Sequence, residues 1–201
     1  MTADTIKHCG IVLAGGKSSR MGKDKALLTF DGETLLDRAI AAIKPLVTEV
    51  IVVVDREDRY SLPAVRKIVD LYPESGPVGG IVTGLLAAGE GYHYIIPCDM
   101  PLLNRQILLL LMESASPPYD AVIPEWNGFP EPVFAVYSHE AVPKLKRFLE
   151  EGGRAAQRAL DQLKTLRIEE SVLKKIDPSG RFLFNMNEPG DLELLHPKNT
   201  E

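Results

Sequence analysis

Residues 10–25, GIVLAGGKSSRMGKDK, contain the pattern that decides the fold. The first four form a short apolar run that is typical of a buried strand, and this run passes directly into a glycine-rich loop. Glycines let a backbone approach a ligand closely, and consecutive N–H groups in such a loop can bind an anion. The stretch therefore predicts a phosphate or nucleotide site where the first strand of an α/β sheet ends.

The loop also has an unusual density of positive charge, with four cations within nine residues: Lys17, Arg20, Lys23 and Lys25. This density suits a triphosphate or a pyrophosphate leaving group. The loop is not a P-loop, because Gly16 and Gly22 are separated by five residues instead of four and Asp24 occupies the Ser/Thr position. It also lacks the G-x-G-x-x-G spacing, which disfavours a dinucleotide-dependent dehydrogenase.

The rest of the first half alternates between strand and helix patterns. Short β-branched runs predict four more buried strands, at residues 50–54, 67–69, 94–96 and 121–123. Apolar residues at helical spacing predict helices between the strands, over residues 34–47, 78–89 and 104–114, the last beginning with an Asn104 cap. We therefore expect an α/β fold of three layers, with a mostly parallel, Rossmann-like sheet and helices on both faces.

The pattern becomes irregular after about residue 125. Residues 130–137 predict an extended strand, residues 165–168 a short strand, and three helices are expected over residues 138–150, 154–163 and 187–192. The chain contains no internal repeat, low-complexity segment or interdomain linker. We expect one α/β domain over residues 1–201, to which the last third adds edge elements.

Composition narrows the class of protein. The chain has 201 residues, a formal net charge of −5 and 25% charged residues, which argues against a general binder of nucleic acids or anionic membranes. Cys9 and Cys98 are far apart, so neither a disulfide framework nor a C-x-x-C metal motif is expected. The first ten residues do not resemble a signal peptide, and the longest apolar run is far shorter than the ~20 residues of a membrane span. We expect a cytoplasmic protein.

Three carboxylates lie where predicted strands end: Asp55 and Asp70 follow their strands directly, and Asp99 follows its strand after Pro97-Cys98. The carboxyl ends of parallel strands meet at one edge of a sheet, which is where open α/β sheets bind ligands. A single acid at such a position is often only a turn former, but three acids and a glycine loop exceed what a scaffold needs. The sequence therefore predicts that these residues share one site.

Residues 13–25, LAGGKSSRMGKDK, resemble the signature L-A-[AG]-G-x-[ST]-x-R-M-x-x-[DN]-K of nucleotidyltransferases, which join an NTP to a phosphorylated acceptor. Residues 76–80 (GPVGG), 97–101 (PCDMP) and 185–192 (NMNEPGDL) resemble one branch, the molybdenum cofactor guanylyltransferases. Together the motifs extend over residues 10–195. The resemblance implies a fold like that of the nucleotide-diphospho-sugar transferases, with a nucleotide-binding part at about residues 1–115 and an acceptor-binding part at about residues 116–201.

The resemblance also implies a reaction, in which the terminal phosphate of molybdopterin attacks the α-phosphorus of GTP. The products would be the guanine dinucleotide cofactor and pyrophosphate. Such a displacement depends on alignment and charge neutralisation more than on a nucleophilic side chain. The implied partners are the two substrates and, transiently, proteins that make the cofactor or mature molybdoenzymes, with no role for nucleic acid or membrane.

Site residues follow from the resemblance position by position. Asp99 is the expected Mg²⁺ ligand, since this hard cation prefers carboxylate oxygens. The expected catalytic residues are Asp99, Lys25 and Arg20, and the expected nucleotide contacts are Leu13, Ala14, Gly15, Lys25, Asp70 and Asp99. Asn185 and Asn187 are candidates for binding the acceptor, or for capping the helix expected after them. Asp55 stands where the family often has Asn, and its carboxylate can accept from guanine but cannot donate.

Several residues have two readings. Trp126 either stacks on the pterin or covers the edge of the core, and Arg154 either binds the acceptor phosphate or only begins a helix. Gly79 and Gly80 allow close approach to the nucleotide or tight helix packing. Cys98 is expected to be a buried residue and not a nucleophile, and the four histidines, which have no ligand spacing, are expected to be structural.

Two other functions stay open at this point. One is a related enzyme, either a cytidylyltransferase for the same pterin or a sugar-phosphate nucleotidyltransferase. The other is a GTP-binding module without chemistry, such as a chaperone or sensor for the cofactor.

Overall fold

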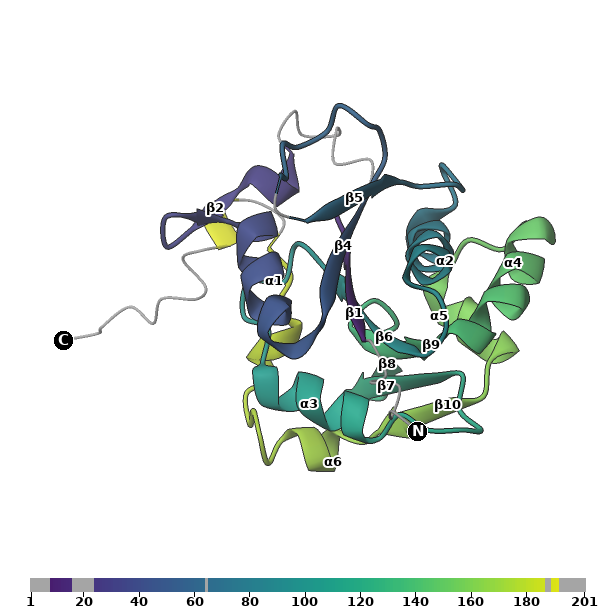
Figure 1. Ribbon diagram of the computed structural model, residues 1–201. Helices are drawn as coiled ribbons and strands as arrows, with labels where there is room; N and C mark the ends of the chain where they lie inside the picture. Colours follow the sequence, from purple (N-terminus) through teal and green to yellow (C-terminus); the bar gives the residue numbers. More distant parts are fainter. Residues whose placement is uncertain (1–7, 16–23, 64, 187–188, 192–201) are drawn as a thin grey trace, which may run out of the picture.

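The structure is a computed structural model that describes residues 8–15, 24–63, 65–186 and 189–191 (Figure 1). Its main sheet contains β1 (Cys9–Leu13), β4 (Glu49–Val54), β5 (Arg66–Val69), β6 (Tyr92–Pro97), β7 (Ala121–Trp126), β8 (Phe129–Pro130), β9 (Ala135–Ser138) and β10 (Thr165–Ile168). A separate hairpin consists of β2 (Thr29–Phe30) and β3 (Glu33–Thr34). The five strands predicted for the first part of the chain are all present.

The order of strands across the main sheet is β10-β7-β9-β6-β1-β4-β5, with β8 paired to β7. β1 lies in the middle and pairs in parallel with β4 and β6, and β5 pairs in parallel with β4. β9 is antiparallel to both β6 and β7, while β10 is parallel to β7. The prediction of a mostly parallel sheet is confirmed.

Helices cover both faces of the sheet (Figure 1). On one face lie α2 (Gly76–Ala88), α4 (Val142–Glu150) and α5 (Ala156–Ala159), and on the other lie α1 (Leu35–Ile43), α3 (Arg105–Glu113) and α6 (Glu170–Leu173). Successive side chains of a strand point to opposite faces, so Ile11 of β1 packs in the cluster under α2 and α4, whereas Val12 packs in the cluster under α1 and α3. The three-layer arrangement is confirmed.

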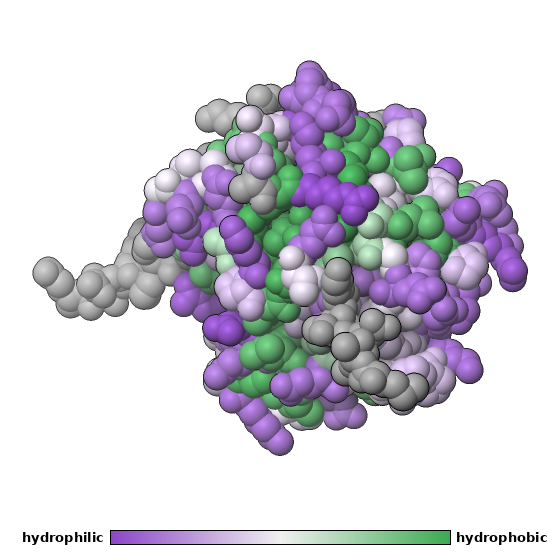
Figure 2. Space-filling model, in the orientation of Figure 1, coloured by the Kyte–Doolittle hydropathy of each residue, from purple (hydrophilic) through white to green (hydrophobic). Residues whose placement is uncertain are grey.

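Short 3₁₀ turns connect or extend these elements: η2 (Lys25–Leu27), η3 (Lys44–Leu46), η4 (His139–Ala141), η5 (Leu160–Gln162), η6 (Arg181–Leu183) and η7 (Pro189–Asp191). In the orientation of Figure 1, hydrophilic residues cover the outer parts of the visible face and hydrophobic residues gather toward its middle (Figure 2). Among the described residues, no helix is long and apolar enough to cross a bilayer.

Side-chain caps set where two of the predicted helices begin. Thr34 Oγ1 accepts a hydrogen bond from Asp37 N at 3.0 Å before α1, and Asn104 Oδ1 accepts from Gln106 N at 2.9 Å before α3. These caps satisfy N–H groups that have no partner inside a helix. The predicted Asn104 cap is confirmed.

The prediction of one extended strand over residues 130–137 is wrong. The segment forms a hairpin arm, β8, and a separate strand, β9, with a turn between them in which Phe134 N donates to Glu131 O at 3.4 Å. Pro130 and Pro132 lack N–H groups and cannot continue a hydrogen-bonded ladder. The chain therefore bends into the carboxyl edge of the sheet at Val133, instead of running straight past it.

The last part of the chain is less helical than expected. The helix predicted over residues 154–163 is shorter, since α5 begins at Ala156 and passes into η5. The helix predicted over residues 187–192 falls partly outside the described residues, which contain only the turn η7. Met186, just before it, is fully buried with Phe30 and Leu35 in a small separate cluster, which we call the hairpin core. Met186 N also donates to Asp99 O at 2.8 Å, which fastens this segment to the end of β6.

Candidate nucleotide site at the carboxyl edge of the sheet

A cavity of about 900 Å³ opens where β1, β4, β5 and β6 end. It is lined by eight residues that the sequence had singled out: Leu13, Ala14, Gly15, Lys25, Asp55, Asp70, Asp99 and Asn185. Arg20 and Asn187, the other two candidates, lie outside the described residues. The strand-end acids and the end of the glycine loop therefore share one cavity, as expected from the parallel strand order.

Backbone ladders hold the rim of the cavity in place. Ala14 N donates to Val53 O at 2.9 Å, Cys98 N donates to Leu13 O at 3.2 Å, and Asp70 N donates to Val54 O at 2.8 Å. Each strand thus stays paired up to the residue that enters the cavity. A Cβ on Gly15 would lie only 3.3 Å from Asp55 N, so this glycine allows two strand ends to approach each other closely.

The glycines of α2 serve close packing. A Cβ on Gly79 would lie 2.7 Å from Tyr72 O, and a Cβ on Gly80 would lie 3.1 Å from Leu13 Cδ2. Real Cβ atoms essentially never come as close as the first distance, so Gly79 is required for the helix to reach the loop after β5. Gly80 also lines the cavity, so this glycine can serve both tight helix packing and close approach to a nucleotide.

Asp70 has a structural task in addition to its place on the cavity. Its Oδ1 accepts from Tyr72 N at 2.9 Å and from Thr83 Oγ1 at 2.8 Å. Thr83 Oγ1 in turn accepts from Leu71 N at 3.0 Å, so the loop after β5 is fastened to α2. These bonds fix the direction of the Asp70 carboxylate toward the cavity wall.

Asp99 and Lys25 line the same cavity, and each is close enough for its charge to act on the other. Burial raises the pKa of the Asp99 carboxyl, and the positive charge of Lys25 acts against that shift. Burial also raises the pKa of Glu131, and the nearby charge of Asp99 adds to this effect. A half-buried carboxylate whose ionised form is disfavoured gains from a cation brought close to it.

The donor set around Asp99 fits magnesium. Within the described residues, no three His, Cys, Asp or Glu side chains form a group that could enclose a metal ion. Mg²⁺ commonly binds through one or two protein carboxylates and completes its shell with substrate phosphates and water. A single cavity carboxylate such as Asp99 is compatible with this mode of binding.

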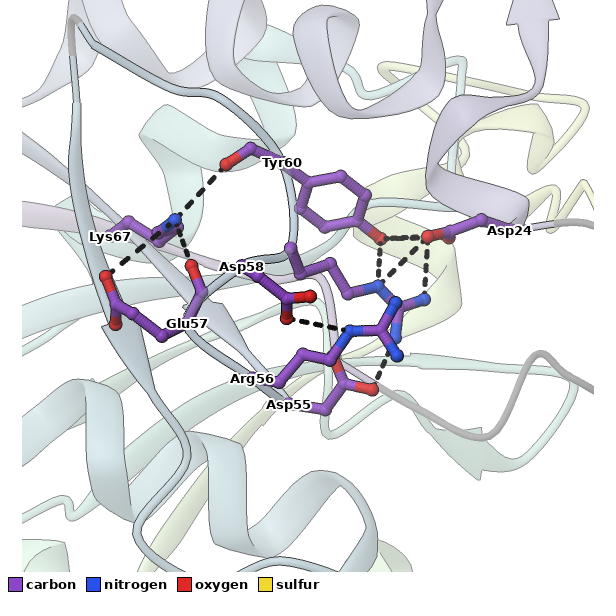
Figure 3. Close-up of polar contacts among 8 residues, drawn as sticks. Asp24, Asp55, Arg56, Glu57, Asp58, Tyr60 and Lys67 are labelled. Carbon is purple, nitrogen blue, oxygen red and sulfur yellow. Dashed lines mark hydrogen bonds and ion pairs between the residues drawn. The ribbon is translucent and has the colours of Figure 1, made fainter.

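A polar network that includes Asp24, Asp55 and Tyr60 was not predicted from the sequence (Figure 3). The Arg59 guanidinium binds the carboxylates of both Asp24 and Asp55, and the Tyr60 hydroxyl lies 2.8 Å from Asp24 Oδ2. Burial alone would lower the pKa of Arg59, but its bonds with Asp55, Tyr60 and Asp24 outweigh that effect and raise it. The available signal was the charged run DREDRY at residues 55–60, directly after a buried strand.

The structure resolves several two-way readings. Burial raises the pKa of the Cys98 thiol to about 12, so the prediction that it is not a nucleophile is supported. Trp126 packs edge-on against Phe182, with ring centroids 5.7 Å apart, and covers the edge of the core. Arg154 Nη1 donates to Leu149 O at 3.2 Å and Gly153 O at 2.7 Å, which is a local structural role.

The histidines in the described residues bind backbone groups. His93 Nδ1 accepts from Cys9 N at 3.1 Å and His93 Nε2 donates to Gly89 O at 3.0 Å. His8 Nδ1 bonds to Tyr92 O at 2.8 Å, and His139 Nδ1 bonds to Leu85 O at 3.1 Å. These three are structural, as predicted, and His196 lies outside the described residues.

The doubly wound sheet, the glycine at the end of β1 and the charged residues around one cavity are the features of an α/β nucleotide-binding protein. Comparison with known proteins then narrows the class. The family described as "MobA-like NTP transferase domain" matches residues 10–166. The chain belongs to this family of nucleotidyltransferases.

Its relatives are similar along nearly their whole length. A protein of Chloroflexus aggregans named "Probable molybdenum cofactor guanylyltransferase" is 37% identical over 195 residues, and 92% of each chain is covered. A "Molybdenum cofactor guanylyltransferase" of Desulfosudis oleivorans is 31% identical, again with 92% of each chain covered. The crystal structure of "Molybdopterin-guanine dinucleotide biosynthesis protein A" from Archaeoglobus fulgidus superposes with a TM-score of 0.79 at 27% identity, covering 92% of this chain and 95% of that one.

Proposed function

We propose that this protein transfers GMP from GTP to the terminal phosphate of molybdopterin, releasing pyrophosphate and forming the guanine dinucleotide cofactor. The names of the relatives that are 31–37% identical support this choice of substrates. The observation that carries the proposal is that Gly15 and Lys25, from the glycine-rich stretch, line one cavity with Asp99 and Asn185, from two distant parts of the chain. That cavity is large enough for a nucleotide together with the phosphate end of an acceptor.

The guanine base is proposed to lie at the end of β1. Backbone N–H and C=O groups of Leu13, Ala14 and Gly15 can read a purine edge without side chains, and Gly15 lets the Asp55 backbone approach this edge closely. Asp55 would accept from guanine N1–H and N2–H₂, and Asp70 would contact the nucleoside from the end of β5. Cytosine has no equivalent pair of adjacent donors, which favours guanine.

The triphosphate is proposed to extend from there toward Lys25, with Arg20 as a further cation. The charge of Lys25 acts on Asp99 within the same cavity, so we place its ammonium where negative charge collects on the leaving pyrophosphate. Neutralising that charge lowers the barrier more than it strengthens ground-state binding. An attacking phosphate oxygen is already ionised near neutral pH and needs no strong base, in agreement with the structural roles of the histidines.

Asp99 is the proposed ligand of Mg²⁺. When bound, the cation supplies charge neutralisation between the nucleotide phosphates and the attacking group. The protein holds the backbone of this residue in place, because the carbonyl oxygen of Asp99 accepts from Met186 N at 2.8 Å. Lys25 lines the same cavity, so opposite charges of the protein are available at the proposed site of phosphoryl transfer.

The acceptor is proposed to enter from the side formed by the last third of the chain. We assign nucleotide binding to about residues 1–115 and acceptor binding to about residues 116–201. Val133, from the turn between β8 and β9, and Asn185 bring this second part to the cavity. Asn185 is the proposed contact for the acceptor phosphate, together with Asn187.

The cellular setting is proposed from the same chemistry. A cytoplasmic enzyme that hands over a labile cofactor would make transient contacts with cofactor-synthesis proteins or with molybdoenzymes during their maturation. The two cysteines of the chain are free thiols, which suits a reducing compartment. We propose no contact with nucleic acid or membrane.

The test incubates the protein with Mg²⁺, molybdopterin and each NTP in turn, and measures pyrophosphate release and the dinucleotide product. We expect turnover with GTP. A preference for CTP would instead indicate the related cytidylyltransferase, and a preference for UTP with a sugar phosphate would indicate a sugar-phosphate enzyme. GTP binding without pyrophosphate release in the presence of the acceptor would indicate a binding module.

A further inference from the structure

The segment after β4 forms a clamp with Asp24, the residue before Lys25 (Figure 3). Arg59 Nη2 lies 2.8 Å from Asp24 Oδ2, Arg59 Nε donates to the same oxygen at 3.0 Å, and Arg59 Nη1 donates to Asp55. The guanidinium thus bridges two carboxylates that are more than 30 residues apart in the chain. We call Asp24, Asp55, Arg59 and Tyr60 the carboxylate clamp.

Tyr60 completes the clamp at the cost of an unusual backbone conformation. Its φ of 54° lies in the left-handed region, which bulky residues rarely adopt. The conformation is held from β5, because Lys67 Nζ donates to Tyr60 O at 3.2 Å and also to Glu57 O. Strained residues persist where the surrounding structure fixes them, often beside functional sites. Here the strain directs the phenol ring toward Asp24 (Figure 3).

The two ends of the clamp lie at the two ends of the proposed nucleotide. Two contacts place one end of the clamp beside the proposed base. The backbone N of Asp55 lies 3.3 Å from the position that a Cβ on Gly15 would take. The Tyr60 hydroxyl donates to Ala14 O at 3.3 Å. On the phosphate side is Asp24, whose Oδ1 accepts from Ala26 N at 3.2 Å and so caps the turn that contains Lys25. A shift at one end would therefore be transmitted to the other.

The charge balance argues against a direct phosphate contact by Arg59. Its side chain is only 11% exposed and is shared by two carboxylates, which outnumber it in charge. A triphosphate would be repelled by such a cluster and attracted by Lys25. The guanidinium is therefore placed to orient other groups, and its planar fork suits the simultaneous binding of two carboxylates.

We propose that Arg59 and Tyr60 are positioning residues that couple recognition of the base to placement of the phosphate-binding Lys25. Arg59 keeps the Asp55 carboxylate directed at the base, and Tyr60 with Arg59 keeps Asp24, and hence the Lys25 turn, in place. This inference rests on the proposed function, since it takes GTP as the nucleotide. It assigns to the charged loop after β4 a part in both nucleotide choice and rate.

The experiment compares Arg59→Lys, Arg59→Met and Tyr60→Phe with the matched control Arg56→Met. Arg56 is in the same loop, but its side chain is exposed and, among the residues that the structure describes, pairs with exposed Asp58 alone, at 3.1 Å. Binding of GTP and of inosine triphosphate, which lacks the N2 amino group, is measured with Mg²⁺, followed by kcat and KM for transfer. Arg59→Lys keeps the charge without the fork, so it is the variant to use if Arg59→Met does not fold.

The two arms of the clamp give different expected results. Both Arg59 variants reduce the preference for GTP over inosine triphosphate about 10-fold and reduce kcat about 10-fold to 100-fold, as expected for losing charge-assisted bonds. Tyr60→Phe reduces kcat about 10-fold and leaves the preference within 2-fold. In a Lys25→Met background the Tyr60→Phe effect on kcat disappears, because it acts through Lys25. Arg56→Met matches the unmodified protein.

Two results overturn the inference. The first is that Arg59→Lys and Tyr60→Phe both keep a kcat and a preference for GTP over inosine triphosphate within 2-fold of the unmodified protein. The other is a Tyr60→Phe effect that is unchanged in the Lys25→Met background. Failure of the proposed function looks different: the unmodified protein would bind GTP without transferring GMP to molybdopterin, and the coupling would still be judged from the binding preference of the Arg59 variants.

Discussion

His93 should make the stability of this protein depend on pH in a defined window. The ring is fully buried at the start of β6, where Nδ1 accepts from Cys9 N and Nε2 donates to Gly89 O. Only the neutral ring with its proton on Nε2 can make both bonds. Burial lowers the pKa of His93, the bond to Gly89 opposes this shift, and the neighbouring His8 and His139 lower the pKa further.

The sign of the effect follows from where the proton binds. The unfolded chain takes up a proton at an ordinary histidine pKa of about 6.5, whereas folded His93 does so only at lower pH. The unfolded state then holds more protons just below pH 6.5, so acid favours unfolding there. The contribution of His93 to the free energy of unfolding is therefore complete above about pH 6.5 and is lost as the pH falls below that value.

The magnitude can be worked from the contacts that protonation would break. A proton on Nδ1 would face the Cys9 N–H, so one hydrogen bond is lost and a buried donor is left unpaired, which costs about 1–3 kcal/mol. One proton can change the free energy of unfolding by at most about 1.4 kcal/mol per pH unit. We therefore expect a loss of about 1–2 kcal/mol from this residue between pH 6.5 and pH 5.

The assay is urea unfolding at half-unit steps from pH 5 to pH 8, with the protein compared to His93→Asn and to His139→Asn. Asparagine can still accept from Cys9 N but does not titrate, so His93→Asn should lower stability at all pH values and flatten the slope below pH 6.5. His139 is half-buried and its charge lowers the pKa of His93, so His139→Asn should make the slope shallower without abolishing it. An unchanged slope in His93→Asn would refute the reasoning.

Three further predictions concern the cavity. Asp99→Ala should keep the fold, because burying the ionised carboxylate costs free energy that alanine does not cost. The variant should lose GMP transfer in a Mg²⁺-dependent assay of pyrophosphate release, and near-normal turnover would exclude Asp99 as the metal ligand. Lys25→Ala should raise the KM for GTP and lower kcat about 10-fold to 100-fold in steady-state kinetics, and unchanged constants would remove Lys25 from the phosphate site. The new Cβ of Gly15→Ala would lie 3.3 Å from Asp55 N. This variant should raise the KM for GTP about 10-fold with a small change in Tm, and GTP binding as tight as before would show that the base lies elsewhere.

The parts of the fold that were predictable are those where local pattern and burial agree. The run at residues 50–54 is β-branched throughout and became β4, with Ile51 and Val53 on one face and Val52 and Val54 on the other. Residues 130–137 looked similar in composition, but two prolines remove donors that a continuous ladder requires. Apolar content alone did not reveal this break.

The site was predictable where chemistry follows a strand end. Asp55, Asp70 and Asp99 could be placed on one edge because parallel strands present their carboxyl ends together. The clamp could not be found in this way, because Arg59 and Tyr60 meet Asp24 only through the folded backbone and a left-handed φ at Tyr60. Pairings of this kind leave no periodic trace in a sequence.

The hairpin core has a consequence for trimmed forms of this protein. Among the described residues, both large apolar clusters use none beyond Leu183, so the packing of the sheet does not depend on Met186. Met186 belongs instead to the hairpin core and donates to Asp99 O at 2.8 Å. A chain cut between Leu183 and Met186 would therefore keep its sheet and lose the bond that ties down the backbone of Asp99, so proteolysis at this point would separate stability from activity.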